Sequence, residues 1–321
     1  MSQTKANNLP VRAGYKDKIG WGRRLGRNIK EHPYLYLMFL PVLAYYIIFH
    51  YWPMYGIIIA FNDFKPMKGI FGSEWVGLLH FKTFLTGPFL WRLLRNTLLI
   101  NFGMLVFAFP LPILFALVLN ECKSVKFRKV VQTVTYMPHF VSSVVVCSLM
   151  LIFCRSNGII TKMLEPFGVL QTNLFSVPGY FKTLYICMNI WQELGWDSII
   201  FFAALTSIDA ALYEAARVDG ANRWQQMWHV TLPGIAPTIT ILLIMRIGSL
   251  MSLGWDRIYL LYSEMIYETA DVISTYVYRM GLGRMQYSFA TAVGLMNSVV
   301  NIILLVSANV VSSKISENSL W

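Results

Sequence analysis

The chain has 321 residues, of which 56% are hydrophobic and 13% are charged, whereas roughly 25% are charged in ordinary soluble proteins. This composition excludes a string of soluble domains and predicts an all-α integral membrane protein. The formal net charge of +11 does not indicate a nucleic-acid partner, because the basic residues lie between long charge-free runs rather than on one solvated face.

Residues 1–31 form a polar, basic tail that we expect to lie in the cytoplasm. The apolar run that follows has no small-residue cleavage site, so a removable signal peptide is not expected. Residues 32–321 are predicted to form one transmembrane domain with a cytoplasmic loop at residues 209–233. The cysteines lie in or beside apolar stretches without metal-binding spacing, and we expect all of them to be buried: Cys122, Cys147, Cys154 and Cys187.

Six stretches are long and apolar enough to cross a bilayer as helices. The first three contain no aspartate, glutamate, lysine or arginine: Tyr34 to about Phe61, Asn96 to Leu119, and Pro138 to Cys154. The other three are Leu184 to Ile208, Ile235 to about Leu253, and Phe289 to Val311. The fourth contains Glu193 and Asp197 and the fifth contains Arg246, and ionisable groups at such depth usually face a bundle interior or a wet cavity.

The distribution of basic residues orients these helices, because lysine and arginine collect in cytoplasmic loops. Basic residues crowd the N-terminal tail, and another group follows the second helix: Lys123, Lys126, Arg128 and Lys129. The loop from Trp255 onward is not basic in balance, which suits the opposite side. Both termini, and the loop between the fourth and fifth helices, are therefore predicted to be cytoplasmic.

That cytoplasmic loop carries the most specific pattern in the chain. It reads Glu214-Ala215-Ala216, three residues, Gly220, nine residues, and then Val230-Thr231-Leu232-Pro233. Alanine favours helix, glycine adopts positive φ, and proline commonly marks a helix boundary, so we expect two short helices that meet near Gly220, with Pro233 at the entry to the fifth helix. Small side chains here would let another protein approach closely.

This pattern resembles the EAA loop of ABC importer permeases, with an apolar valine at 230 in place of the usual isoleucine and Met227 where many sugar permeases have phenylalanine. In that family the loop forms coupling helices that sit in a cleft of an ATPase subunit. The resemblance implies that the following residues couple this chain to the ATPase: Glu214, Ala215, Ala216, Arg217, Asp219, Gly220 and Pro233. An ordinary amphipathic cytoplasmic hairpin is the alternative for the short EAA stretch taken alone.

The resemblance extends along nearly the whole chain. Phe61-Asn62-Asp63-Phe64 and Asn96-Thr97-Leu98-Leu99 look like carbohydrate permeases of the MalF-like class. Met137 to Val145, Asp271 to Arg279 and the terminal Ser319-Leu320-Trp321 look like the LplB-type branch, which is associated with complex oligosaccharides and polysaccharide fragments. The larger permease of bacterial alginate importers is also similar.

The resemblance implies a type I ABC importer permease fold in the bacterial inner membrane, in contact with membrane lipid. It also implies a second homologous permease subunit, two ATPase subunits, and a periplasmic or lipid-anchored binding protein that delivers a glycan. The sequence has no GxxxxGK[ST] loop, so we expect no cofactor in this chain and place ATP and Mg²⁺ in the partner ATPase. ATPase closure would move the docked loops and switch the membrane cavity by alternating access.

Polar and aromatic residues in the fourth helix are candidates for the substrate pathway: Asn189, Trp191, Glu193, Trp196 and Asp197. Tryptophan suits the apolar face of a sugar ring, while amides and carboxylates exchange hydrogen bonds with hydroxyl groups. The alternatives are that the tryptophans belong to an interfacial belt and that the carboxylates pair with Arg246.

The fifth and sixth helices hold further candidates for the same pathway. Arg246 either meets an acidic sugar or pairs with Asp197 or Glu193, and we favour the pairing. Asn297 and Asn301 share one face of the sixth helix, where they bond either sugar hydroxyls or another helix. Helix packing is the favoured role for both asparagines.

Other classes of membrane protein fit the sequence less well. An embedded enzyme needs a nucleophile or a metal constellation, and the sequence has no HExxH or GxSxG motif and only five scattered histidines. No catalytic or metal-ligating residues are therefore expected. Six helices could form half of a secondary transporter, but that class does not account for the spacing of the loop from Glu214 to Pro233.

Overall fold

The computed structural model describes residues 28–169, 172–315 and Leu320. The basic tail up to Arg27 lies outside these residues, as do Ser319 and Trp321, so the predicted cytoplasmic tail at residues 1–31 stays a prediction. The chain divides into two compact units, the first ending at Gly56 and the second beginning at Ile57.

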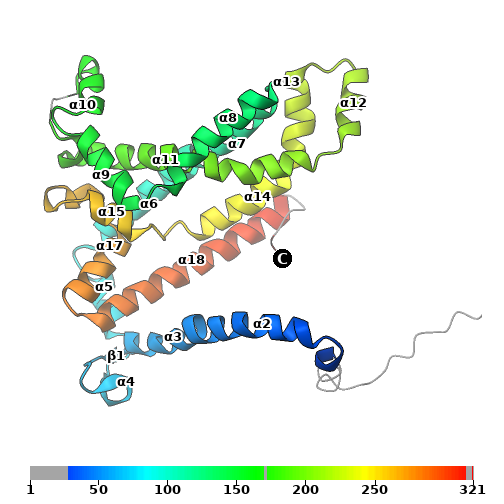
Figure 1. Cartoon of the computed structure of the whole chain (residues 1–321). Coiled ribbons are helices and arrows are strands. Elements are labelled where there is room, and N and C mark those ends of the chain that lie inside the picture. The colour runs from blue at the N-terminus through cyan, green and yellow to red at the C-terminus, as the bar shows by residue number, and fades with distance from the viewer. Residues whose placement is uncertain (1–27, 170–171, 316–319, 321) are drawn as a thin grey trace, which may run out of the picture. The chain divides into compact units, whose positions relative to one another are not determined.

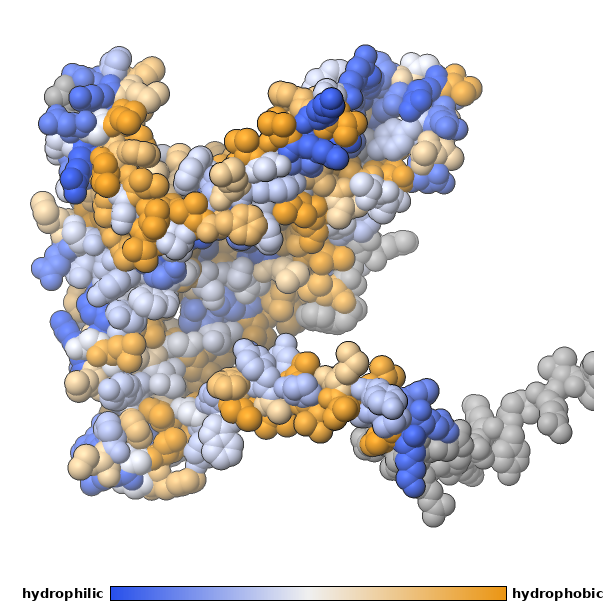
Figure 2. Space-filling model, viewed as in Figure 1, coloured by the Kyte–Doolittle hydropathy of each residue, from blue (hydrophilic) through white to orange (hydrophobic). Residues whose placement is uncertain are grey.

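The described part of the first unit is an apolar helical segment. It begins with α2 (Pro33–Tyr46) and continues through the π-helical turn η1 (Ile47–Tyr51) and α3 (Trp52–Met54) into the 3₁₀ segment η2 (Tyr55–Phe61). The whole run of 29 residues is long and apolar enough to cross a membrane. It agrees with the predicted first span, and its side chains are mostly apolar and exposed (Figure 2).

A short antiparallel ribbon opens the second unit. Strand β1 (Asn62–Asp63) pairs with β2 (Glu74–Trp75), with α4 (Gly69–Gly72) between them and α5 (Leu79–Leu85) after them. The ring of Phe61 stacks on that of Trp75 at 5.6 Å, and the carbonyl oxygen of Asn62 lies 3.1 Å from Nε2 of His80. In this ribbon Asn62 lies opposite Trp75 and Asp63 lies opposite Glu74.

The second span starts earlier than predicted. α6 (Leu90–Gly103), the π-helical turn η3 (Met104–Ala108) and α7 (Pro110–Asn120) form one apolar helix of 31 residues. The predicted start was Asn96, because Arg92 and Arg95 break the apolar run in the sequence. Arg92 reaches Asp271, so an ion pair allows this charged first turn to continue the helix.

The third span is broken, which corrects the prediction of one helix from Pro138 to Cys154. α8 (Val125–Tyr136) runs into the 3₁₀ turn η4 (Met137–Phe140), and α9 (Ser143–Phe153) restarts after a bend of 98°. Ser142 caps the restart by accepting a hydrogen bond from the amide of Val145. The break exposes backbone polar groups, and Nε2 of Gln192 satisfies the carbonyl oxygen of Val141 at 3.1 Å.

The fourth span is α11 (Pro178–Thr206), which bends by 70° into α12 (Ala210–Val218). Between α9 and α11 lie three short turns: α10 (Ile159–Leu164), η5 (Glu165–Phe167) and η6 (Leu174–Ser176). Of the four cysteines, Cys147 and Cys154 are buried as predicted, whereas Cys122 is half-buried and Cys187, on α11, is exposed. The prediction of burial was wrong for Cys187, because an apolar span has an outer face as well as a packed one.

The fifth span includes part of the predicted loop. α13 (Arg223–Gln226), η7 (Met227–Thr231) and α14 (Leu232–Gly248) form one continuous helix of 26 residues. Pro233 therefore does not interrupt this helix. It lies in the first turn of α14, just after a π-helical turn that tolerates the missing amide. The predicted end at Leu253 was too late by five residues, since the helix ends at Gly248.

Short elements connect the fifth span to the last one. They are α15 (Trp255–Leu261), η8 (Glu264–Ile266), α16 (Tyr267–Ala270), α17 (Ile273–Tyr278) and η9 (Arg279–Gly283). The final helix, α18 (Tyr287–Ile315), packs along α14, and α11 packs along α7 (Figure 1). Among the described residues, four helices could cross a membrane alone, and six spans result when each bent pair counts as one.

A buried carboxylate holds the short elements to the second span. Asp271 is fully buried and pairs with Arg279 at 2.7 Å and with Arg92 of α6 at 3.2 Å. Asn96 donates to the carbonyl oxygen of Asp271 at 3.0 Å, so two segments that carried the family resemblance meet here. Burial would lower the pKa of Arg279, but its hydrogen bonds to Asp271 and the attraction to that carboxylate raise it above the ordinary value.

Gly195 permits the close approach of α11 to α8. A Cβ at this position would overlap the carbonyl oxygen of Thr135, whereas a Cβ at Gly179, in the first turn of α11, would meet nothing within 4 Å. We predict that Gly195→Ala destabilises the protein by about 1–3 kcal/mol, because backbone atoms must shift. The midpoint of thermal unfolding in detergent measures this, with Gly179→Ala as the matched control; equal midpoints for the two variants would contradict it.

Candidate functional site

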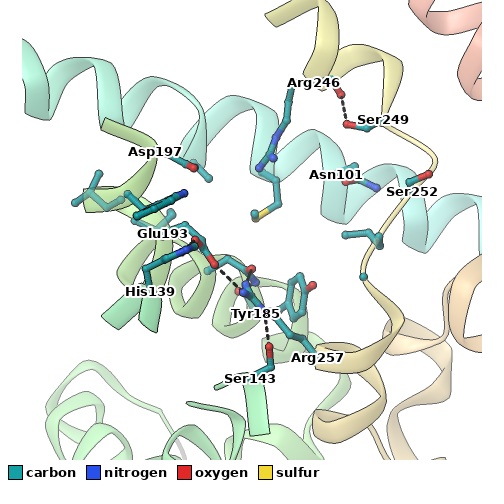
Figure 3. Close-up of a pocket in the computed structure, with 18 of the residues that line it drawn as sticks. Asn101, His139, Ser143, Tyr185, Glu193, Asp197, Arg246, Ser249, Ser252 and Arg257 are labelled. Carbon is teal, nitrogen blue, oxygen red and sulfur yellow. Dashed lines mark hydrogen bonds and ion pairs between the residues drawn. The ribbon is translucent and has the colours of Figure 1, made fainter. Parts of the chain in front are cut away.

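Polar side chains from several spans surround a cavity of about 520 Å³ in the second unit (Figure 3). Its walls come from the second span, the break in the third span, α11, the end of α14 and the start of α15. The charged and titratable side chains in its lining are His139, Tyr185, Glu193, Asp197, Arg246, Asp256 and Arg257. An adjoining cavity of about 500 Å³ shares Trp196, Asp197, Arg246 and Ser249 with it.

Helix α11 supplies one polar face of this cavity. Asn189, Glu193 and Asp197 follow one another at intervals of four residues, which places them on one side of a helix, and all three line the cavity. Trp191 does not line either cavity and is 51% exposed, which favours the interfacial role over a sugar contact. Trp191 and Trp196 therefore have different surroundings, although the sequence could only assign both to the same helix.

Trp196 lies in the walls of both cavities. Its ring stacks on the imidazole of His139, with centroids 4.2 Å apart and planes at 3°. His139 comes from the break in the third span, so the stacking joins η4 to α11. An exposed edge of such a pair offers an apolar surface beside hydrogen-bonding groups, the combination that a sugar ring needs.

The carboxylate of Glu193 is held from two sides. Oε1 accepts a hydrogen bond from Arg257 at 2.6 Å, and Oε2 lies 2.6 Å from Nδ1 of His139. Arg257 also donates to Oδ1 of Asn189 at 2.6 Å. The predicted partner of Glu193 was Arg246, and this was wrong: the arginine that pairs with it comes from the segment after the fifth span.

Arg246 points into the cavity near Asp197 (Figure 3). No ion pair of Arg246 within 4.0 Å is found among residues 28–169 and 172–315, so the favoured pairing with Asp197 or Glu193 is absent there. The carbonyl oxygen of Arg246 accepts a hydrogen bond from Ser249 at 3.0 Å, which closes the last turn of α14. Its guanidinium is therefore a cation of the cavity wall that attracts the carboxylate of Asp197 without a direct ion pair.

The two asparagines of α18 have different surroundings. Asn301 accepts from the amide of Met251 at 3.0 Å and donates to Ser252 at 2.7 Å, so it joins α18 to the segment after α14, in agreement with helix packing. Asn297 lines neither cavity, and its buried Oδ1 has no hydrogen-bond partner in the described part of the chain. Its predicted place on the substrate pathway stays a prediction without support from the cavity lining.

The segment from Ala210 to Val230 forms a hairpin in which α12 turns back to α13. Gly220 lies at the turn with φ of +81°, as expected from its position in the pattern. Asn222 and Gln225 form a capping box at the start of α13, which satisfies the first amides of the long helix. Hydrophilic side chains gather over α12 and α13 (Figure 2).

The predicted coupling residues lie together on this hairpin. The exposed ones are Glu214, Ala215, Arg217, Asp219 and Gly220, whereas Ala216 is half-buried and lines a groove of about 340 Å³ between the two arms. The hydroxyl groups of Tyr213 and Thr231 lie 3.0 Å apart and tie α12 to the long helix. Pro233 is exposed but lies beyond the hairpin, inside the span.

Sequence reasoning missed three cavity residues. Arg257 was counted only as a loop charge, and His139 and Ser143 entered only through the resemblance of the stretch Met137 to Val145, without a role in a cavity. A usable signal existed for Arg257, because this positive charge follows the end of the fifth span by nine residues. Nothing in the sequence shows that α15 folds back against α9 and α11.

Three comparisons with known proteins agree with one another. The family described as "Binding-protein-dependent transport system inner membrane component" matches residues 108–317. Protein LplB of Bacillus subtilis is 43% identical over 99% of this chain and 98% of its own length. The polygalacturonan/rhamnogalacturonan transport system permease protein YteP of the same organism is 44% identical over 93% of this chain and 94% of its own length.

Two solved structures have the same fold. A chain of a bacterial ABC transporter involved in the import of the acidic polysaccharide alginate is 44% identical, with a TM-score of 0.82 over 91% of this chain and 99% of that one. A chain of a bacterial alginate ABC transporter in complex with an alginate pentasaccharide-bound periplasmic protein is 42% identical, with a TM-score of 0.83 over 92% of this chain and 100% of that one.

Proposed function

Because this chain belongs to the family of binding-protein-dependent transport system inner membrane components, we propose that it is the permease subunit of an importer for oligosaccharides or polysaccharide fragments. The observation that carries the proposal is the exposed hairpin with the EAA spacing, which lies at the end of apolar helices that also enclose a polar cavity. The relatives that transport polygalacturonan, rhamnogalacturonan and alginate support the choice of substrate class.

The energy source in this proposal is a pair of separate ATPase subunits. The sequence contains no phosphate-binding GxxxxGK[ST] loop, so ATP and Mg²⁺ would bind in those partners. Two ATPases require two docking hairpins, and a second homologous permease would supply the other one. A periplasmic or lipid-anchored binding protein would deliver the glycan to the side opposite the hairpin, with both termini of this chain in the cytoplasm.

The long helix from Arg223 to Gly248 supports a mechanical route from hairpin to cavity. It runs without a break for 26 residues, and Arg246 lies in its last turn. A rigid helix that is displaced at the hairpin must move at its other end as well. Closure of the ATPases would therefore shift the wall that carries Arg246 and change access to the cavity.

An acidic glycan fits the cation that this wall presents. Arg246 faces both cavities without an ion pair in the described residues, and a guanidinium binds a carboxylate through two parallel hydrogen bonds. The ring pair of Trp196 and His139 would lie against an apolar sugar face. In this proposal Asn189 and Asp197 provide further hydrogen-bonding groups along α11.

Reconstitution tests the proposed function directly. The permease pair, the ATPase and the binding protein would be placed in liposomes, and uptake of a labelled oligosaccharide would be followed with and without ATP. We predict uptake only when ATP and loaded binding protein are both present. Uptake that proceeds without ATP would contradict the proposal and favour a secondary transporter.

Gly220 provides a test of the hairpin. A Cβ at Gly220 meets no atom within 4 Å, so its side-chain space is open and the difficulty lies in the positive φ. We predict that Gly220→Val weakens uptake per ATP hydrolysed, since a β-branched residue strains this turn by about 1–2 kcal/mol. Gly220→Asn is the control, because asparagine tolerates positive φ. Equal coupling ratios in both variants and the unmodified protein would argue against docking through this turn.

Arg246 provides a test of the substrate class. We predict that Arg246→Gln lowers the uptake of a uronate oligosaccharide at least about tenfold, because a hydrogen bond to a charged group contributes ~1.5–3 kcal/mol. Arg246→Lys would restore part of the rate, since it keeps the charge but not the bidentate geometry. The control is Arg155→Gln, an exposed arginine outside the cavity. Unchanged uptake by Arg246→Gln would show that the cation does not read the carboxylate.

A further inference from the structure

The side chain of Arg257 uses the polar groups of the cavity as a bound ligand would. Its three nitrogens reach three acceptors on two other elements: Oδ1 of Asn189 at 2.6 Å, Oε1 of Glu193 at 2.6 Å and Oγ of Ser143 at 3.4 Å. Asn189 and Glu193 belong to α11, Ser143 begins α9, and Arg257 itself belongs to α15. One guanidinium thus connects α9, α11 and α15 in the cavity wall.

The side chains that Arg257 contacts also have other partners. The amide nitrogen of Asn189 already donates to the carbonyl oxygen of Tyr185 at 2.8 Å, and the second oxygen of Glu193 already faces His139. The side chains of Arg257 and Glu193 are only 20% and 22% exposed. A hydroxyl group that binds Asn189 or Glu193 therefore shares these acceptors with the guanidinium or displaces it.

The segment that carries Arg257 is joined to the fifth span by a connection that is not helical. α14 ends at Gly248, and residues 249–254 connect it to the seven-residue α15 without forming helix. α15 packs against α9 and α17, while its guanidinium crosses to α11. A change in the angle between α9 and α11 must therefore break the contacts of Arg257, because one side chain cannot span both at a greater separation.

We propose that Arg257 is an internal ligand of the transport cavity. It occupies Asn189 and Glu193 when no glycan is present, joins α9, α11 and α15, and must release α11 before the cavity opens to the binding protein. The contacts stabilise the resting conformation relative to the open one, so they contribute to the requirement for loaded binding protein in ATP hydrolysis. The consequence for ATPase activity rests on the proposed function; the occupation of the cavity does not.

The first experiment measures ATP hydrolysis by the reconstituted transporter without binding protein. Arg257→Ala is expected to raise this basal rate about tenfold, which corresponds to ~1.4 kcal/mol taken from the resting conformation. Glu193→Gln removes the same ion pair from the other side and is expected to act in the same direction. Arg155→Ala, which removes an exposed arginine after α9, should keep the basal rate of the unmodified protein.

The second experiment uses this chain without transport. A cysteine in place of Ser249, which lines both cavities, is introduced after Cys122 and Cys187 are replaced by serine, and its reaction with a charged maleimide is timed in detergent. Arg257→Ala is expected to speed the labelling at least about threefold, an amount that corresponds to ~0.65 kcal/mol. The midpoint of thermal unfolding shows whether each variant still folds.

The two experiments distinguish a failure of the internal-ligand proposal for Arg257 from a failure of the proposed transport function. Folded variants with unchanged labelling and an unchanged basal rate would overturn the proposal for Arg257 and leave a purely structural ion pair. Faster labelling in a protein whose partners never hydrolyse ATP in response to the binding protein would support the internal ligand and overturn the proposed function. If Arg257→Ala fails to fold, the same readouts on Glu193→Gln decide the question, because glutamine keeps the shape of the side chain.

Discussion

The carbonyl oxygen of Val141 and the carboxylate of Glu193 illustrate the constraint on which the rest of the structure depends. A backbone or charged group that is buried away from water costs free energy unless another group of the chain bonds to it. Gln192 reaches the carbonyl group at the break of the third span, and Arg257 and His139 reach the carboxylate. The break, the cavity and the folded-back α15 therefore belong to one arrangement of hydrogen bonds.

The same constraint operates where the short elements between α14 and α18 meet the second span. Asp271 is fully buried, and two arginines and the amide of Asn96 surround it. Removing such a charge pair from water is unfavourable unless its geometry is complete, so this cluster holds the short elements in one position. It thereby positions α15, whose arginine enters the cavity, through α17, against which α15 packs.

Mechanical continuity distinguishes the hairpin from an ordinary loop. α13 continues through a π-helical turn into α14. The turn at Gly220 lies just before the start of this continuous helix, and Arg246 lies in its last turn. A proline at position 233 would break most helices, yet here it lies just after the π-helical turn Met227–Thr231, which accommodates the missing amide within the continuous helix. In the proposed mechanism, a displacement of the hairpin therefore also moves the cavity wall, because one helix connects them.

The amino-acid sequence by itself determined the membrane class, the approximate spans, the hairpin and the family, because apolar length and the spacing around Gly220 are local properties of the chain. Tertiary structure decided what the charges do. The break in the third span, the partner of Glu193, the lack of an ion pair for Arg246 among the described residues and the separation of Trp191 from Trp196 all depend on which helices face each other. Residues 193 and 257 are far apart in the chain, and no local pattern records that one side chain reaches the other.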